Sequence, residues 1–167
     1  MTLKKETIGI YATGGTFDKE YNELDGSLFF KDTHIYEMLK RGRCTVAVSI
    51  RTLMLMDSAD MTDEERNIIL ANCKHTTKKR IVITHGTDTM IDTAHLLGNH
   101  ITEKTIVLTG ALIPYAFGSS DGFFNLGNAL AYVQVLPPGV YIVMNGQYFA
   151  PDAVKKNFST GYFEKIT

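Results

Sequence analysis

Two threonine-rich segments carry residues whose types and order suit nucleophilic chemistry. Thr13-Gly14-Gly15-Thr16 follows the apolar run 8–12, and His85-Gly86-Thr87-Asp88-Thr89 follows the apolar run 81–84. Residues just past the carboxyl ends of neighbouring parallel strands gather in one crevice of the sheet. Hydroxyl groups that meet there provide a nucleophile and the groups that activate it. The two segments therefore predict an enzyme.

Thr16 is the candidate nucleophile. Gly14 and Gly15 let the backbone approach a ligand closely, and their N–H groups are suited to a nest for an oxyanion. The same residues also fit a plain strand-end turn that ends in a capping threonine. Thr87 and Asp88 likewise allow two interpretations. They supply groups to the reaction, or the Asp88 carboxylate simply caps a helix from its first turn. His85 is interpreted as structural, since its side chain precedes the glycine turn.

Length and composition limit the kinds of partner that the chain is expected to bind. The chain has 167 residues, which suits one domain over 1–167, and its net charge of -1 provides no broad basic field. We therefore expect no nucleic acid and no membrane partner, and no apolar run approaches the roughly 20 residues of a membrane span. Met1–Glu6 has no signal-peptide pattern, so a cytoplasmic location is expected. Cys44 and Cys73 form no C-x-x-C pair and are interpreted as reduced packing residues.

Motifs for metals and cofactors are missing from the sequence. The histidines form no H-E-x-x-H pattern and no cluster with cysteines. Neither G-x-G-x-x-G nor G-x-x-x-x-G-K-[ST] occurs, and no G-x-S-x-G elbow is present. We therefore expect no cofactor and no metal site.

Apolar, β-branched runs alternate with helix-like segments along the chain. The near-continuous hydrophobicity of the runs is typical of strands buried on both faces. Thr62 with Glu65 three residues later is a capping box. This alternation predicts an α/β fold with a doubly wound, mostly parallel sheet and helices on both faces. Strands are expected at Thr7–Ala12, Thr45–Ile50, Arg80–Thr84, Thr105–Thr109 and Val140–Met144, and helices at Asp32–Arg41, Thr62–Lys74, Asp88–Leu97 and Phe123–Val135.

Two long loops interrupt this alternation. Residues 16–31 are polar and aromatic, with Asp25-Gly26 as a turn signal, and a loop of that length in a domain is often a functional lid. The segment Leu112–Gly122 is the second loop. Because the first loop starts at Thr16, we expect it to close over the crevice.

At these residues the chain resembles the bacterial-type L-asparaginase family. The family's hallmarks are T-G-G-T followed by an apolar residue, and H-G-T-D-T. Further similar segments follow in the family's order, so the resemblance spans nearly the whole chain and is specific to the family's N-terminal domain. The matching segments are Thr13 to Phe17, Ser58 to Met61, His85 to Thr89, Leu108 to Ala111, Ser119 to Leu126, and Val143 to Asn145 leading to Val154 to Lys156.

The resemblance implies hydrolysis of a small amide, L-asparagine or a relative of it, through an acyl-enzyme. By position, Thr16 matches the nucleophile, and Thr87, Asp88 and Lys156 match the set that activates the nucleophile or water. Tyr21 corresponds to the tyrosine of the lid. The substrate-binding positions implied by the resemblance are Gly15, Ser58, Ala59, Gly86 and Asp88, of which Ser58 and Asp88 hold the α-carboxylate and α-amino groups of the substrate.

Two departures from the family pattern leave alternatives open. Ala59 stands where well-known members have a glutamine that contacts substrate, and the family's usual C-terminal domain is absent from residues 1–167. The chain is thus similar to short, stand-alone asparaginase-domain proteins. Besides an amidohydrolase, it fits a module that binds an amino acid or dicarboxylate without turnover, or a half-enzyme completed by a partner chain. Because the family assembles, a homodimer or larger homo-oligomer is expected.

Overall fold

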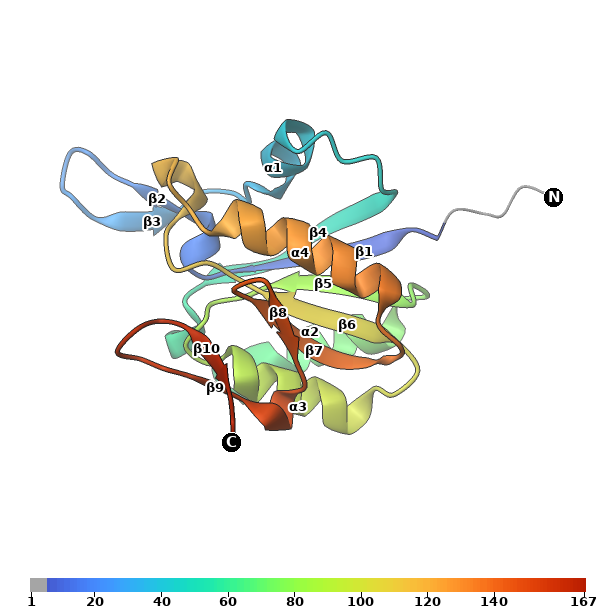
Figure 1. The fold of residues 1–167 in the computed structure, drawn as a ribbon. Helices are drawn as coiled ribbons and strands as arrows, with labels where there is room; N and C mark the ends of the chain where they lie inside the picture. The colour runs from blue at the N-terminus through green and yellow to red at the C-terminus, as the bar shows by residue number, and fades with distance from the viewer. Residues whose placement is uncertain (1–5) are drawn as a thin grey trace.

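A six-stranded sheet forms the centre of residues 6–167, the part of the chain that the computed structural model describes (Figure 1). The strand order is β4-β1-β5-β6-β7-β8, with all neighbours parallel except the antiparallel edge strand β8. The predicted doubly wound, mostly parallel α/β fold is confirmed. Residues 1–5, most of the segment used to predict the lack of a signal peptide, lie outside the described residues. The strands are β1 (Ile8–Gly14), β4 (Val48–Met56), β5 (Arg80–Thr84), β6 (Thr105–Thr109), β7 (Gly139–Met144) and β8 (Gln147–Phe149).

Helices cover both faces of the sheet. Helices α1 (Ile35–Arg41) and α4 (Gly122–Val135) lie on one face, and α2 (Asp63–His75) and α3 (Met90–His100) lie on the other (Figure 1). Each face has its own apolar core, because the buried strands β1, β5 and β6 send alternate side chains to opposite sides. None of the helices described is both long and apolar enough to cross a membrane.

The connection from β6 through α4 to β7 differs in hand from the others. The chain moves in the same direction across the sheet from β5 to β6 and from β6 to β7, yet α3 packs in the core on one face and α4 in the core on the other. Crossovers of this kind are right-handed in about 98% of cases. The first three connections share one hand, so the α4 connection is the left-handed one. It leaves room beside α3 for the last segment of the described chain.

Most predicted elements are found with shifted ends. The strand expected at 45–50 runs from Val48 to Met56 and is only half buried, because it is an edge strand of the sheet. Cys44 lies before this strand and is half-buried. The capping box is confirmed, since the Thr62 N–H donates to Glu65 Oε2 at 2.7 Å and Thr62 Oγ1 accepts from the Glu64 N–H at 3.2 Å.

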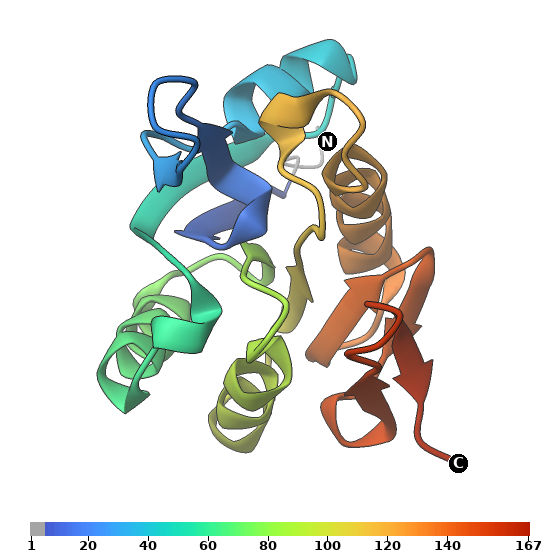
Figure 2. The ribbon, with the colours of Figure 1, turned by 90° about the vertical axis from the view of Figure 1, so that its left-hand side faces the viewer.

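Several short elements are not evident from the sequence. The expected lid contains a single 3-10 turn, Thr16–Asp18, followed by the hairpin of β2 (Lys19–Tyr21) and β3 (Leu28–Phe30). A second antiparallel pair, β9 (Val154–Lys156) and β10 (Phe163–Lys165), follows β8. Both hairpins project at the end of the molecule where the parallel strands finish (Figures 1 and 2). Further 3-10 turns cover Ser58–Asp60, Tyr115–Phe117 and Pro151–Ala153.

Candidate active site

The two threonine-rich segments leave the sheet side by side. Strands β1 and β5 are paired, with Ala12 opposite Thr84, and the Thr13 hydroxyl donates to Thr84 O at 2.7 Å. Among the parallel strands, β1 and β5 flank the point where the chain order reverses, since β4 lies on the far side of β1. Ligands of open α/β sheets bind outside the carboxyl ends of the strands at such a switch point. Figure 2 views the molecule from this end.

Glycines allow three site segments to touch. Gly15 has φ +71°, and a Cβ there would lie 2.5 Å from Gly86 Cα, while a Cβ on Gly86 would lie 2.6 Å from Ser58 Oγ. Real Cβ atoms do not approach other atoms this closely, so both positions require glycine. The contacts bring Gly15, Gly86 and Ser58 together, and their role in binding substrate stays a prediction.

The Gly15 N–H is already used within the fold. It donates to Met56 O at 2.8 Å. The oxyanion nest suggested by the glycines of the first segment therefore lacks one of its donors. The physical reason is the positive φ at Gly14, +93°, which turns the end of β1 back against β4.

Lys156 lies on β9 and forms hydrogen bonds with the second threonine-rich segment, residues 85–89. Its Nζ donates to Thr87 Oγ1 at 2.8 Å and to Asp88 Oδ1 at 2.6 Å, and its side chain is only 8% exposed. Asp88 does not cap α3, because the helix begins at Met90 with Thr89 as its N-cap. The Asp88 carboxylate is instead paired with the lysine and half exposed, so its second oxygen is open to a ligand. A hydroxyl that accepts from an ammonium group loses its proton more easily.

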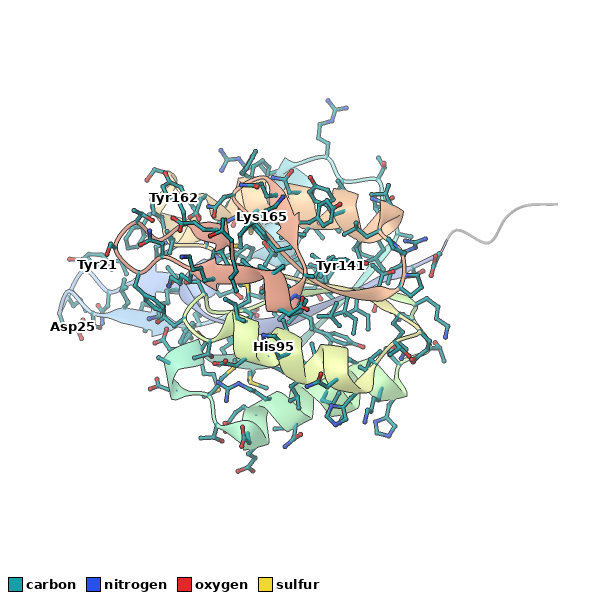
Figure 3. All side chains as sticks on the ribbon, turned by 60° about the horizontal axis from the view of Figure 1, so that its bottom comes forward. Tyr21, Asp25, His95, Tyr141, Tyr162 and Lys165 are labelled. Atoms are coloured by element: carbon teal, nitrogen blue, oxygen red, sulfur yellow. The ribbon has the colours of Figure 1, made fainter. Side chains whose placement is uncertain are left out.

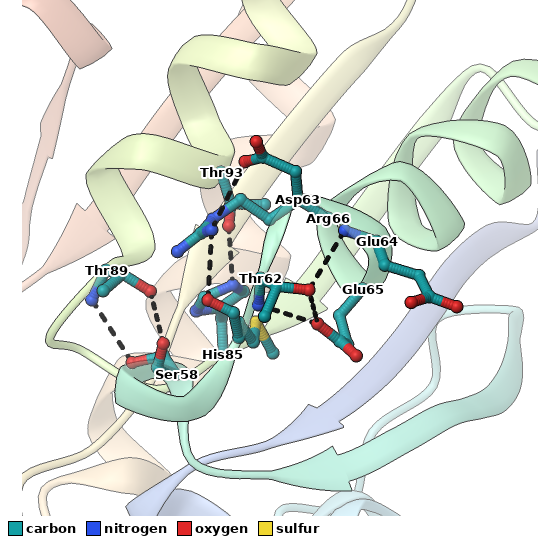
Figure 4. A network of polar contacts seen from close by, with 10 residues as sticks. Ser58, Thr62, Asp63, Glu64, Glu65, Arg66, His85, Thr89 and Thr93 are labelled. Atoms are coloured by element: carbon teal, nitrogen blue, oxygen red, sulfur yellow. Dashed lines mark hydrogen bonds and ion pairs between the residues drawn. The ribbon is translucent and has the colours of Figure 1, made fainter.

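Ser58 is fixed by the residue that follows Asp88. Its Oγ accepts from the Thr89 N–H at 3.2 Å, and its carbonyl oxygen accepts from the Thr89 hydroxyl at 2.8 Å (Figure 4). The Ser58 hydroxyl still has its own proton to donate. Ala59 lies next to it, exposed, in the same 3-10 turn.

Thr16 and Tyr21 are less constrained. Within residues 6–167, no group forms a hydrogen bond with the Thr16 hydroxyl, which is partly exposed. Tyr21 lies in β2 with its ring 6.4 Å from the Phe117 ring, and its hydroxyl lies on the side of Gly26. Figure 3 shows Tyr21 and Asp25 in the projecting hairpin and Tyr162 at the same end of the molecule. Tyr21 therefore lies in the hairpin at the same end of the molecule as the candidate site, and its role as a lid residue stays a prediction.

A buried carboxyl supports the Thr16 turn. Asp18 Oδ1 accepts from the His34 N–H at 2.9 Å and from the Thr33 hydroxyl at 3.1 Å, which ties the turn to the start of α1. Asp18 Oδ2 is buried and has no partner among the described residues. Burial raises the pKa of Asp18 to about 6, because the charged form loses its hydration.

His85 is part of the scaffold beneath the site. It is fully buried, and its Nδ1 bonds to Gly86 O at 2.7 Å. Its Nε2 bonds to Thr93 Oγ1 at 2.8 Å (Figure 4). Because a carbonyl only accepts, Nδ1 holds the proton and Nε2 accepts from the threonine hydroxyl. Burial lowers the pKa of His85 to about 4, so the ring is neutral at pH 7. Both ring nitrogens are thus occupied, as a structural residue requires.

Other side chains at this end had no assigned role in the sequence. The Phe158 ring lies 4.8 Å from Lys156 Nζ, a cation–π contact at the rim. Asn125 and Asn145 link the neighbouring loops through hydrogen bonds. The Asn145-Gly146 dipeptide is a turn signal that predicts the tight β7–β8 connection. In residues 6–167 no group of three His, Cys, Asp or Glu side chains is arranged to hold a metal ion.

Comparison with known proteins places this geometry in a family. Residues 7–164 match the model of the asparaginase N-terminal domain. The chain is 37% identical to a probable periplasmic L-asparaginase of Haemophilus influenzae, over 92% of this chain and 47% of the relative. It is 35% identical to L-asparaginase 1 of Escherichia coli, over 96% of this chain and 50% of the relative.

Solved structures of two L-asparaginases have the same fold as this chain. The thermostable L-asparaginase of Thermococcus kodakarensis superposes with a TM-score of 0.85 at 27% identity, covering 96% of this chain and 51% of that one. A probable cytoplasmic L-asparaginase of Campylobacter jejuni gives a TM-score of 0.81 at 29% identity, covering 96% and 53%. The chain spans about half the length of the relatives that it matches. With its fold, its two threonine segments and its lysine in register with them, the chain belongs to the asparaginase family, whose N-terminal domain it matches.

Proposed function

We propose that this chain hydrolyses the side-chain amide of L-asparagine, or of a related small amide, to a carboxylate and ammonia. The observation that carries the proposal is Lys156, which donates to both Thr87 and Asp88 beside the crossing of Gly15 and Gly86. This arrangement supports the proposal, because the Thr87 hydroxyl and the Asp88 carboxylate follow Gly86, which meets Gly15 just before Thr16. The names of the similar proteins, L-asparaginases, support the same reaction.

In the proposed reaction the Thr16 oxygen attacks the amide carbon. The C–N bond breaks, ammonia leaves with the proton that the hydroxyl gives up, and an acyl-enzyme remains. Water then attacks the acyl carbon and returns a proton to Thr16. Lys156 supports the Thr87 hydroxyl, through which protons move. The open oxygen of Asp88 takes the substrate's α-ammonium, and the Ser58 hydroxyl takes its α-carboxylate. In this proposal the substrate-binding site is lined by Gly15, Gly86 and Ala59, and it is covered by Tyr21.

The test is ammonia release from L-asparagine, L-glutamine, D-asparagine and simple amides. We expect Thr16→Ala to lower turnover on the order of 10³-fold or more while the circular dichroism spectrum stays unchanged, because the nucleophile is lost. Thr16→Ser keeps a hydroxyl and should retain part of the activity. Thr77→Ala is the matched control, since Thr77 is exposed in the loop before β5. This variant should release ammonia at the wild-type rate. Full activity in Thr16→Ala would contradict the mechanism.

The second candidate function is binding without turnover. The observation in its favour is the Thr16 hydroxyl, which has no hydrogen-bond partner among residues 6–167. A sensor needs Asp88 and Ser58 to hold an amino acid but needs no activated threonine. Calorimetry with L-aspartate separates the two: heat of binding together with no ammonia from any amide supports the sensor. No binding and no turnover would favour a half-enzyme that requires a partner chain.

The assembly and location that fit this function are proposals as well. We place the protein in the cytoplasm as a homodimer or a larger homo-oligomer. One similar protein is named periplasmic and another cytoplasmic, so fractionation of cells that express the full protein is the direct test of location.

A further inference from the structure

We propose that Asn125 and Asn145 act as positioning residues that set Lys156 in register with Thr87 and Asp88. The inference rests on the proposed function for its catalytic consequence, but the placement of Lys156 is measurable without turnover. Among the described residues, no hydrogen bond joins either asparagine to the lysine. Both act through the β9–β10 hairpin that carries it.

Asn125 links two loops at the strand ends. It lies in the first turn of α4, is almost fully buried, and its Nδ2 donates to Gly110 O at 2.9 Å. Its Oδ1 accepts from the Asn145 N–H at 3.3 Å. Gly110 follows β6 and Asn145 follows β7, so one amide joins the ends of two neighbouring strands. A buried amide with both ends satisfied fixes the distance between the groups that it bridges.

Asn145 carries the link on to the hairpin. Its Oδ1 accepts from the Phe163 N–H at 3.0 Å. Phe163 pairs with Lys156 across the antiparallel β9–β10 ladder, and its ring is buried in the same core as Val154. Because side chains alternate along a strand, a slip of one residue in this pairing would turn Lys156 away from Thr87. The bond to Phe163 holds the register at the residue opposite the lysine.

The backbone of Asn145 suits this task. Its φ is +55°, a left-handed conformation that asparagine adopts more readily than most residues other than glycine. The turn with Gly146, at φ +77°, directs the Asn145 side chain away from the β7–β8 hairpin and toward β10. A glycine would accept the same backbone conformation without strain but would supply no acceptor. An aspartate would supply the acceptor.

Besides the buried Phe163 and Val154 side chains, the hairpin is held at this end mainly by hydrogen bonds of its own turn. Its own turn is closed by Asn157, whose N–H donates to Tyr162 O at 2.8 Å. Lys156 itself is held by Asp88 and Thr87, the groups that it is proposed to serve. The hydrogen bond from the Phe163 N–H to Asn145 Oδ1 therefore ties the β9–β10 hairpin to the central sheet without involving Thr87 or Asp88.

The first test measures where Lys156 lies, by amine labelling with a small reagent followed by peptide mass spectrometry. Lys155 is exposed and provides an internal reference one residue away. In wild type we expect Lys156 to label far more slowly than Lys155. Asn145→Gly should raise the Lys156 rate severalfold and leave the Lys155 rate unchanged, whereas Asn145→Asp should label like wild type.

The second test measures catalysis on the substrate identified by the amide panel. Asn145→Gly should lower kcat by about 10–10²-fold, because a small misplacement of a catalytic group costs that much, with a smaller change in KM. Asn145→Asp should recover most of the loss. Asn128→Ala is the matched control on α4, since Asn128 Nδ2 has no hydrogen-bond partner among the described residues. It should match wild type in both tests.

The outcomes separate the two proposals. If wild type releases no ammonia from any amide, the proposed function fails, and the labelling ratio still tests the positioning. If Asn145→Gly labels at the wild-type ratio and keeps wild-type kcat, Asn145 does not position the lysine. If Asn145→Asp loses as much as Asn145→Gly, the acceptor at this position is not the cause, and the proposal is likewise overturned.

Discussion

At the scale of single residues, two buried titratable groups near the crevice respond to pH in opposite ways. Burial raises the pKa of Asp18 to about 6 from an ordinary 3.8 and lowers that of His85 to about 4 from 6.5. The neutral form is favoured in both cases. Stability contributed by Asp18 is present below about pH 4 and is lost as the pH rises to about 6. Stability contributed by His85 is present above about pH 6.5 and is lost as the pH falls to about 4.

Asp18→Asn should therefore raise the free energy of unfolding at pH 8 by up to about 3 kcal/mol, since the pKa is raised by about two units at 1.36 kcal/mol each. The amide oxygen can accept the same bonds from His34 and Thr33, while the buried charge is removed. The gain should shrink toward pH 4 and disappear below the ordinary pKa of 3.8, where Asp18 is protonated in both the folded and the unfolded protein. Urea unfolding at pH 4, 6 and 8 measures this.

Asp25→Asn is the control for the stability measurement. Asp25 is exposed in the β2–β3 turn, where hydrogen bonds from Ser27 lower the pKa of its carboxyl. Its replacement should not stabilise the protein at any of the three pH values. A lower stability of Asp18→Asn than of wild type at pH 8 would mean that the negative charge itself holds the turn of Thr16, and the argument from burial would be wrong.

At the scale of secondary-structure elements, the sequence predicts the long elements and misses the short ones. The strands at 80–84 and 105–109 match the prediction at both ends, because both are apolar runs in the middle of the sheet. The three-residue strands β2, β3, β9 and β10 are too short to show an alternation of side chains. The left-handed α4 connection also cannot be predicted from hydrophobic pattern, since handedness depends on which face the helix covers.

The same division applies to the candidate site. Glycine and threonine types past the ends of two apolar runs predict a crevice at β1 and β5, which is where Gly15 and Gly86 meet. Lys156 is implied only by resemblance, because nothing local in a polar tail points to Thr87. It reaches Thr87 because α4 covers the opposite face and the β9–β10 hairpin packs beside α3. Its role in catalysis stays a prediction.

The crossing of two loops at Gly15 gives a prediction at this scale. Gly15→Ala should destabilise the fold by at least about 1–3 kcal/mol, because φ is +71° and the new Cβ would lie 2.5 Å from the Gly86 backbone. It should also abolish amide turnover, since the two threonine segments would be forced apart. Thermal unfolding and the ammonia assay measure both effects.

Gly127→Ala is the matched substitution within α4. A Cβ at Gly127 would meet nothing within 4 Å, and the residue lies inside the helix. The substitution should stabilise the protein by about 0.5–1 kcal/mol and leave turnover unchanged. If Gly15→Ala were as well tolerated as Gly127→Ala, the two loops would not need the close approach, and Thr16 would not be held by it.

At the scale of the whole molecule, the end that carries Thr16 and Lys156 exposes several large apolar side chains. Large apolar side chains lie exposed on the hairpins and loops around Lys156, and Phe158, 73% exposed, is among them. Exposed apolar groups that gather at one place commonly mark a surface that meets another molecule. The exposed residues at this end are Tyr21, Leu112, Ile113, Phe117, Phe158 and Tyr162.

We therefore expect the purified chain to associate through this end and to be more active when associated. Sedimentation velocity between about 0.1 and 50 μM should show a dimer or larger species that dissociates on dilution, because burial of apolar surface drives association. Specific activity should fall over the same range if a second copy covers the Thr16 crevice. Phe158→Ser should shift the dissociation to higher concentration, whereas Val135→Ser, on the exposed end of α4, should not. A monomer whose specific activity is independent of concentration would show that the crevice works uncovered, and the aromatic rim would then serve the substrate or a different chain.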